Sequence, residues 1–144
     1  RCLVGSEMCI RDRAKDIIPN IIDELPLLSV LACFAEGETK VSGAKELRVK
    51  ESDRLSAIEL MLKNIGVEFD VFEDGFNIIG KGANYQFSSG NFVSFGDHRI
   101  AMCSALCALK ATENIFIDNV QSVTTSFPNF FEILEQMGFT IEEA

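Results

Sequence analysis

The sequence lacks a long uninterrupted apolar segment and has few basic residues. Its longest apolar stretch, residues 25–35, is interrupted by Pro26 and Ser29 and is much shorter than the roughly 20 residues that a membrane-spanning helix needs. Lys and Arg number 13 against 22 Asp and Glu, which gives a net charge of −9. We therefore expect no membrane partner and no nucleic-acid partner, although one local basic pocket remains compatible with this charge.

The cysteine and histidine patterns of disulfide scaffolds and zinc sites are also missing. The five cysteines are odd in number and form no pair separated by two residues, and His98 is the single histidine. We expect no metal site. Cys103 and Cys107 lie four residues apart in an expected helix, which favours small core residues in a reducing compartment, the cytoplasm.

The composition indicates one globular domain. Hydrophobic residues make up 47% and charged residues 24% of the 144 positions, values that exclude general disorder. Residues 1–13 differ from the rest because they hold three arginines and two cysteines without periodicity. This segment lacks the apolar stretch of a secretory signal and resembles a translated cloning-adaptor end, with a native disordered arm as the alternative. We expect a partial domain over residues 14–144 that begins inside a longer protein.

An internal repeat divides this domain. Asp23 and Asp97 are candidate helix caps 74 positions apart, and so are Ser52 and Ser126. Two glycines at positions 66 and 138 are 72 positions apart, and each is suited to end a helix. We therefore predict two repeats, about residues 23–72 and 97–142, in an α/β fold with mixed sheets and helices packed between them.

The hydrophobic patterns assign the elements within each repeat. The expected helices cover residues 23–34, 53–65, 98–109 and 127–137. The expected strands cover residues 38–42, 67–72, 76–79, 115–118 and 139–142, with a looser segment at 80–96. The apolar faces of the first two helices are formed by Leu27, Leu28, Leu31 and Phe34, and by Leu55, Ile58, Met61, Leu62 and Ile65. The first and third helices are expected to be parallel and to pack through Leu27, Leu31, Met102 and Leu106.

Residues 48–55, with the sequence RVKESDRL, are dense in charge and precede an expected helix. In one interpretation this is a solvated loop whose charges pair among themselves. In the other, Arg48, Lys50 and Arg54 gather at a helix N-terminus, which already attracts anions through its free N–H groups. Glu51 is then either held ionised by its basic neighbours or, if buried, tuned as an acid.

A second charged cluster follows Asp97. His98 and Arg99 occupy the first turn of a helix, where a cation opposes the helix dipole by about 0.3–1 kcal/mol. An anionic ligand would explain them, although His98 alone is also compatible with local packing. Asp23 by itself indicates only a helix start, but the repeat relates it to Asp97. Three helix N-termini are therefore expected to converge on one anion-binding cleft.

Four motifs, IDELP at 22–26, LRVKESDRL at 47–55, GDHRIAM at 96–102 and SFP at 126–128, closely resemble the C-terminal part of the 5-enolpyruvylshikimate-3-phosphate synthase family. The resemblance covers residues 16–142. It implies a protein about three times this length with two similar domains, each made of three βαβαββ units about a pseudo-threefold axis, and an active site between them. This chain is then about two units of one domain. The N-terminal domain is missing, and the parent protein is expected to be a monomer.

The resemblance also implies a reaction of the shikimate pathway to chorismate and aromatic amino acids. The enolpyruvyl group of phosphoenolpyruvate passes to shikimate 3-phosphate with release of phosphate, through a tetrahedral intermediate and without a cofactor. By motif position, Asp23 accepts the proton of the attacking hydroxyl and Glu51 handles the proton at the methylene carbon. The expected substrate-binding residues are Lys50 for shikimate 3-phosphate, and Arg54, Arg99 and nearby His98 for phosphoenolpyruvate.

The sequence departs from the family motifs at two positions, and two alternative functions remain open. Thr125 and Glu46 stand where some members of the family have lysine and asparagine, so one phosphoenolpyruvate contact is unassigned. The alternatives are a fragment of the sister enzyme that transfers enolpyruvate to UDP-N-acetylglucosamine, and a non-catalytic anion-binding domain of the same fold. For either enzyme, we expect this chain to be inactive alone.

Overall fold

A computed structural model describes residues 14–142 of the chain, so the predictions for residues 1–13 lie outside the described residues. The helices are α1 (Ala14–Ile21), α2 (Leu25–Cys33), α3 (Arg54–Ile65), α4 (His98–Cys107), α5 (Gln121–Ser126) and α6 (Phe130–Gln136), with short 3₁₀ helices η1 (Ile22–Glu24), η2 (Lys45–Val49) and η3 (Ala108–Lys110). The strands are β1 (Glu36–Val41), β2 (Glu68–Phe72), β3 (Gly75–Lys81), β4 (Gly90–Phe92) and β5 (Ile115–Ile117).

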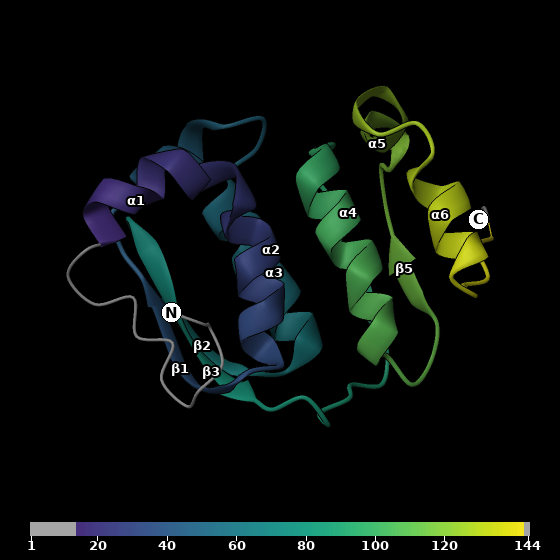
Figure 1. Ribbon diagram of the computed structural model, residues 1–144, viewed down its shortest axis with the longest axis horizontal. Coiled ribbons are helices and arrows are strands. Elements are labelled where there is room, and N and C mark those ends of the chain that lie inside the picture. The colour runs from purple at the N-terminus through teal and green to yellow at the C-terminus, as the bar shows by residue number, and fades with distance from the viewer. Residues whose placement is uncertain (1–13, 143–144) are drawn as a thin grey trace.

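A layer of helices separates two sheets (Figure 1). The first sheet is antiparallel in the order β1-β3-β2, and the second is the parallel pair β4-β5. Helix α2 packs on β3, and α3 contacts β2 on one side and β4 on the other, while α4 contacts α2, α3 and β5. This arrangement confirms the expected α/β architecture with helices between sheets.

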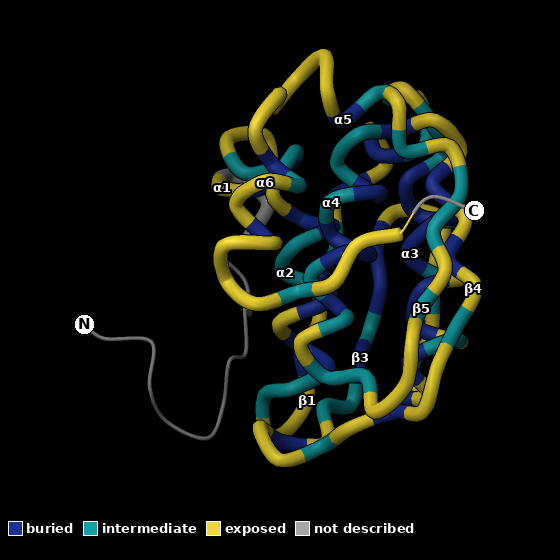
Figure 2. The backbone as a smooth tube through the Cα atoms, turned by 90° about the vertical axis from the view of Figure 1, so that its right-hand side faces the viewer, coloured by how far each residue is buried: buried dark blue, intermediate teal, exposed yellow. Residues whose placement is uncertain are grey.

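The main hydrophobic core lies between the first sheet and helices α2, α3 and α4. Figure 2 shows β3 as a largely buried strand and β1 as more exposed, in agreement with their burial patterns. The five apolar residues predicted to face inward on α3 are all buried, which confirms that helix. It ends as predicted at Gly66, whose φ of +76° is readily adopted only by glycine.

Helix α2 packs differently from the prediction. The side chain of Leu31, expected to face inward, is 54% exposed, whereas Ser29, Ala32 and Cys33 are completely buried. Leu27, Leu28 and Phe34 do pack against the core, and the prediction was wrong for Leu31. Helix α2 is covered by β3, α3 and α4, and its small residues allow this close approach. Helices α2 and α4 do lie side by side (Figure 1), but Met102 of α4 packs in a second cluster with α5 and α6.

Three further predictions, all in the second half of the chain, need correction. The helix expected at 127–137 is shorter, because α6 covers only Phe130–Gln136. A separate helix that was not expected, α5, ends at Ser126, just before Phe127 and Pro128. Proline disfavours helical backbone in the residue before it. The strand expected at 139–142 is not formed, whereas β4 lies inside the segment expected to be loose. Whether the two repeats superpose stays a prediction.

The three cysteines in the described part of the chain, Cys33, Cys103 and Cys107, are free and buried. Burial raises the pKa of the Cys33 and Cys103 thiols to about 12. Cys103 and Cys107 of α4 belong to the hydrophobic core, as predicted. A buried thiol that stays protonated is unreactive.

Candidate active site

Helices α2, α3 and α4 begin close together, and the side chain of Arg54 joins their N-termini. Arg54 is the first residue of α3, and its side chain is only 2% exposed. Its Nη1 lies 2.8 Å from Oδ1 of Asp23, in the turn before α2, and its Nε lies 2.7 Å from Oδ2 of Asp97, at the start of α4. Since each contact uses a different nitrogen, the planar guanidinium fixes the relative positions of two carboxylates.

Asp97 is a completely buried anion. Its carboxylate accepts hydrogen bonds from Arg54, from the hydroxyl of Ser52 at 3.1 Å and from the backbone N–H of Arg99 at 2.9 Å. The last of these bonds caps α4, as the sequence predicted. Burial alone would raise the pKa of this carboxyl, but the hydrogen bond and charge of Arg54 hold the pKa below its ordinary value. Asp97 is therefore ionised at neutral pH.

Asp23 does not cap α2, contrary to the prediction, because it lies within η1. Its carboxylate is partly exposed and is shared between Arg54 and Lys50, whose Nζ is 3.3 Å away. Burial would raise the pKa of Asp23, but its contacts with Lys50 and Arg54 lower the pKa overall. The structure thus places an ionised, solvent-accessible carboxylate between two cations.

Ser52 and Ser126 were also expected to cap helices, and both expectations are wrong. Asp53 caps α3 by accepting the backbone N–H of Ser56 at 3.1 Å, and Ser52 turns instead toward Asp97. Ser126 is the last residue of α5. Aspartate and serine are both good caps, so the sequence alone did not decide between neighbours.

Glu51 and His98 form the other half of the site. Oε2 of Glu51 lies 2.8 Å from Nδ1 of His98 and 3.8 Å from Nη2 of Arg54. Glu51 is exposed, and its pairing with His98 connects the loop before α3 to the first turn of α4. This geometry places a carboxyl group and an imidazole within hydrogen-bond distance of each other.

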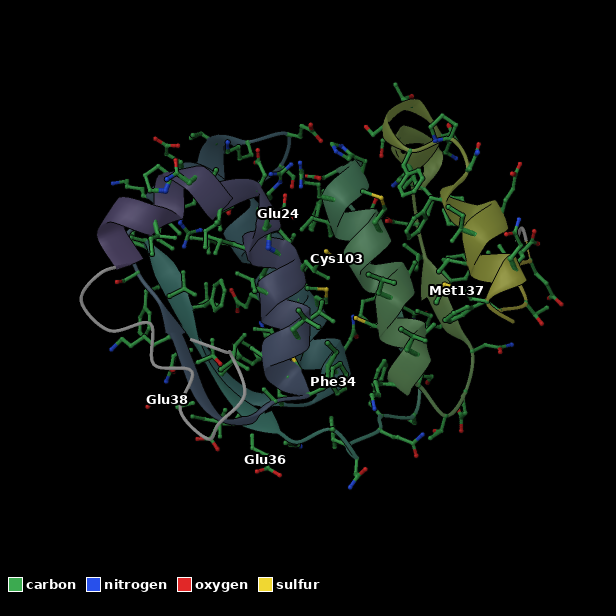
Figure 3. All side chains as sticks on the ribbon, viewed as in Figure 1. Glu24, Phe34, Glu36, Glu38, Cys103 and Met137 are labelled. Carbon is green, nitrogen blue, oxygen red and sulfur yellow. The ribbon has the colours of Figure 1, made fainter. Side chains whose placement is uncertain are left out.

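Arg99 is held over the N-terminus of α2. Its Nη1 donates to the backbone carbonyl of Asp23 at 3.0 Å and to Oε1 of Glu24 at 3.2 Å. Figure 3 shows Glu24 at the end of α2 that adjoins the start of α4. Glu24 was not among the predicted site residues, and only its place next to Asp23 in the IDELP motif could have suggested it.

Glu51, Asp97 and His98 each offer one potential metal ligand, and these atoms lie within 4.8 Å of one another. The oxygens of Asp97 already accept from Arg54, Ser52 and the Arg99 amide. A cationic guanidinium in direct contact with the ligand set disfavours a second cation there. The arrangement therefore suits an anion beside the carboxylates better than a metal ion between them.

All six predicted site residues are brought together by these contacts, from segments up to 76 positions apart. A family model described as EPSP synthase (3-phosphoshikimate 1-carboxyvinyltransferase) matches residues 8–134. The chain belongs to the EPSP synthase family. The match begins within residues 1–13, so the separation of that segment from the domain stays a prediction.

Several EPSP synthase relatives are similar over most of this chain. The 3-phosphoshikimate 1-carboxyvinyltransferase of Aquifex aeolicus is 47% identical over 123 residues, which is 85% of this chain and 28% of the relative. The 3-phosphoshikimate 1-carboxyvinyltransferase of Persephonella marina is 45% identical over 123 residues, again 85% of this chain and 28% of the relative. A solved structure of EPSP synthase from Acinetobacter baumannii has 42% sequence identity and a TM-score of 0.83 over 89% of this chain and 30% of its own. The EPSP synthase fold is thereby confirmed, and the chain spans about 30% of these relatives.

Proposed function

We propose that the whole protein transfers the enolpyruvyl group of phosphoenolpyruvate to shikimate 3-phosphate and releases phosphate. The observation that carries this proposal is the buried Arg54, which joins Asp23 to Asp97 and lies near Glu51 at the start of three helices. This part of the site combines cations for anionic substrates with two separate carboxyl groups. The reaction needs both, because one group must accept a proton where another delivers one.

Lys50, Arg54 and Arg99 are the proposed anion-binding groups. Lys50 binds shikimate 3-phosphate, and the two arginines bind phosphoenolpyruvate with His98 nearby. Each of the three cations contacts a carboxylate or carbonyl oxygen at the N-terminus of α2. Because the helix N-termini add positive potential at the same place, a multiply charged substrate is stabilised there.

Asp23 and Glu51 are the proposed proton-transfer residues. The substrate hydroxyl attacks C2 of phosphoenolpyruvate while its proton passes to Asp23, and Glu51 delivers a proton to the methylene carbon C3. In the second step the C2–O bond to phosphate breaks and C3 returns a proton to Glu51, which restores the double bond, while the proton held by Asp23 leaves with phosphate. The contact between Glu51 and His98 supports this assignment, since it gives Glu51 a neighbour for proton exchange.

Substrate binding also adjusts the basicity of Asp23. In the free site, Lys50 and Arg54 lower the pKa of Asp23, which makes this carboxylate a weak base. Anionic substrates bound to the same two cations neutralise part of their charge. The pKa of Asp23 then rises toward its ordinary value when the attacking hydroxyl is in place.

We further propose that a second, N-terminal domain supplies the remaining contacts and that the protein is a cytoplasmic monomer. The relatives are more than three times as long as the matched segment, which supports the additional domain. Three free buried thiols in residues 14–142 support a reducing compartment. In the same residues, no helix is long and apolar enough to span a membrane.

A hybrid enzyme tests the proposed reaction. In this protein, called the Aquifex hybrid, residues 14–142 replace the matching segment of the Aquifex aeolicus relative. We expect phosphate release from phosphoenolpyruvate with shikimate 3-phosphate and none with UDP-N-acetylglucosamine. Release only with the UDP sugar supports the sister enzyme. Binding of shikimate 3-phosphate without turnover supports a non-catalytic domain, and the unmodified Aquifex relative is the positive control.

A further inference from the structure

The loop that carries Lys50 and Glu51 is held from outside the site by Arg48. All three types of nitrogen in its guanidinium donate hydrogen bonds: Nη1 to the carboxylate of Asp53 at 3.0 Å, Nε to the carbonyl of Glu73 at 2.9 Å and Nη2 to the carbonyl of Phe72 at 2.7 Å. None of these partners belongs to the proposed substrate-binding set. Arg48 therefore links the tip of the β2–β3 hairpin to the start of α3.

The bond between Arg48 and Asp53 closes a short loop around the proposed site residues. Val49, Lys50, Glu51 and Ser52 are the four residues between its two ends. Asp53 is itself fixed, because it caps α3 and accepts from both the amide and the hydroxyl of Ser56. Although burial raises its pKa, the bonds from Ser56 and Arg48 hold the pKa of Asp53 below its ordinary value, so it carries the charge that Arg48 needs.

The hairpin tip is a rigid support for this contact. Oδ2 of Asp74 accepts from the N–H of Gly43 at 3.0 Å, and the Asp74 carbonyl accepts from the N–H of Ala44 at 2.7 Å. A Cβ atom at Gly75 would lie 2.0 Å from the carbonyl oxygen of Val41, so the chains approach as closely as glycine allows. Both ends of η2 are therefore attached to the hairpin.

We propose that Arg48 is a positioning residue for the reaction, which holds Lys50 and Glu51 in place by fastening their loop to the hairpin tip and to Asp53. The inference rests on the proposed function. Arg48 itself touches no reacting atom in the proposed mechanism. A lysine at position 48 could not replace it, since one ammonium group cannot reach three acceptors that lie in a fixed planar fork.

The test compares Arg48→Lys with Lys45→Gln in the Aquifex hybrid. Lys45 contacts Glu73 of the same hairpin, but both side chains are more than 70% exposed, so this pair contributes little. For Arg48→Lys we expect KM for shikimate 3-phosphate to rise and kcat to fall, each by about 10-fold, and backbone amides 49–52 to exchange about 10-fold faster. Lys45→Gln should leave all three quantities unchanged.

A double-mutant cycle separates positioning from general stability. If Arg48 acts through Glu51, Arg48→Lys should lower kcat by less than about twofold once Glu51 is glutamine. The same loss of kcat in both backgrounds would overturn the inference. Asp53→Asn is a second variant that keeps a side-chain oxygen for the α3 cap while removing the charge that Arg48 meets, and it should reproduce the effects of Arg48→Lys.

Failure of this inference is distinguishable from failure of the proposed function. If the unmodified hybrid turns over and Arg48→Lys behaves like Lys45→Gln in kinetics or in exchange, the role of Arg48 is wrong. If the unmodified hybrid has no turnover, the proposed function is wrong. In that case the hydrogen exchange of backbone amides 49–52 is the remaining test of whether Arg48 holds the loop. Unchanged exchange in Arg48→Lys then overturns the loop-holding role as well.

Discussion

The guanidinium of Arg54 makes contacts that no other side chain could make together. It is almost completely buried, yet it bonds to carboxylates from two other segments, one of them also fully buried. Buried ion pairs of this kind gain little net stability, but removal of one partner leaves an uncompensated charge. The residue thus fixes geometry more than it stabilises the fold.

Replacement of Arg54 by lysine should weaken phosphoenolpyruvate binding. One ammonium group cannot bond to Asp23 and Asp97 at once, and loss of a charged hydrogen bond corresponds to about a 10- to 100-fold rise in KM. Steady-state kinetics of the Aquifex hybrid measure this change. Lys63→Gln, which removes an exposed ion pair with Glu59, is the control and should change KM less than about twofold. Unchanged affinity in Arg54→Lys would show that the binding role is wrong.

Asp97 should make the stability of the domain sensitive to acid. Its pKa is lowered in the folded state, so its stabilising effect is complete above the unfolded pKa and is lost as the pH falls through the folded pKa. Asp97→Asn should cost about 3–5 kcal/mol at pH 7, because Arg54 then lacks its charged partner, and less below about pH 4. Urea unfolding of the hybrid between pH 7 and 3 measures the difference. An equal loss of unfolding free energy at pH 7 and at pH 3 would contradict the ionised state assigned to Asp97.

At the level of elements, periodicity predicted the inward face of α3, where polar residues mark the opposite side, and failed for Leu31 of α2, a helix without a charged residue. Helix α3 carries Glu59 and Lys63 on its more exposed side, so its inward residues and its C-terminal end at Gly66 were found. Helix α2 is covered on several sides, and Leu31 points outward despite its apolar pattern. The repeat predicted that Asp23, Arg54 and Asp97 lie near one cleft. It did not predict the buried ion pair of Arg54 with Asp97, because the burial of Asp97 depends on the packing of α3 against α4.

Two leucines of α3 test the assigned face directly. Leu62 is completely buried and Leu60 is 39% exposed, although they are two residues apart on the same helix. Leu62→Ala should lower the free energy of unfolding by about 2–5 kcal/mol, since it leaves a cavity in the core. Leu60→Ala should cost less than about 1 kcal/mol, in proportion to its smaller buried area. Equal losses in chemical unfolding of the two hybrid variants would contradict the orientation of α3.

At the scale of the whole molecule, the described residues bring two carboxyl groups and three cations of the proposed site together. The described surface also exposes large apolar side chains from several elements, including Leu31, Leu109, Phe116 and Met137. Exposed apolar surface favours association with other protein surfaces. A second domain would both cover the site and supply opposing contacts, as closure commonly does in enzymes of two domains.

The isolated 144-residue chain should therefore release no phosphate and should self-associate. Its net charge of −9 repels both anionic substrates at long range, although salt screens this effect beyond about 8–10 Å. Phosphate assays and light scattering of the purified chain check the two expectations. Phosphate release that is abolished by Asp23→Asn would show instead that the site is complete within this chain.

In the proposed mechanism, Asp23 accepts a proton at a site built by three helix N-termini. The most direct test is Asp23→Asn in the Aquifex hybrid, with turnover and shikimate 3-phosphate binding measured on the same preparation. We expect a fall in kcat of about 10²–10⁴-fold with binding retained, because asparagine keeps the shape of the side chain but cannot accept the proton. Normal turnover in this variant would show that Asp23 is not the proton acceptor.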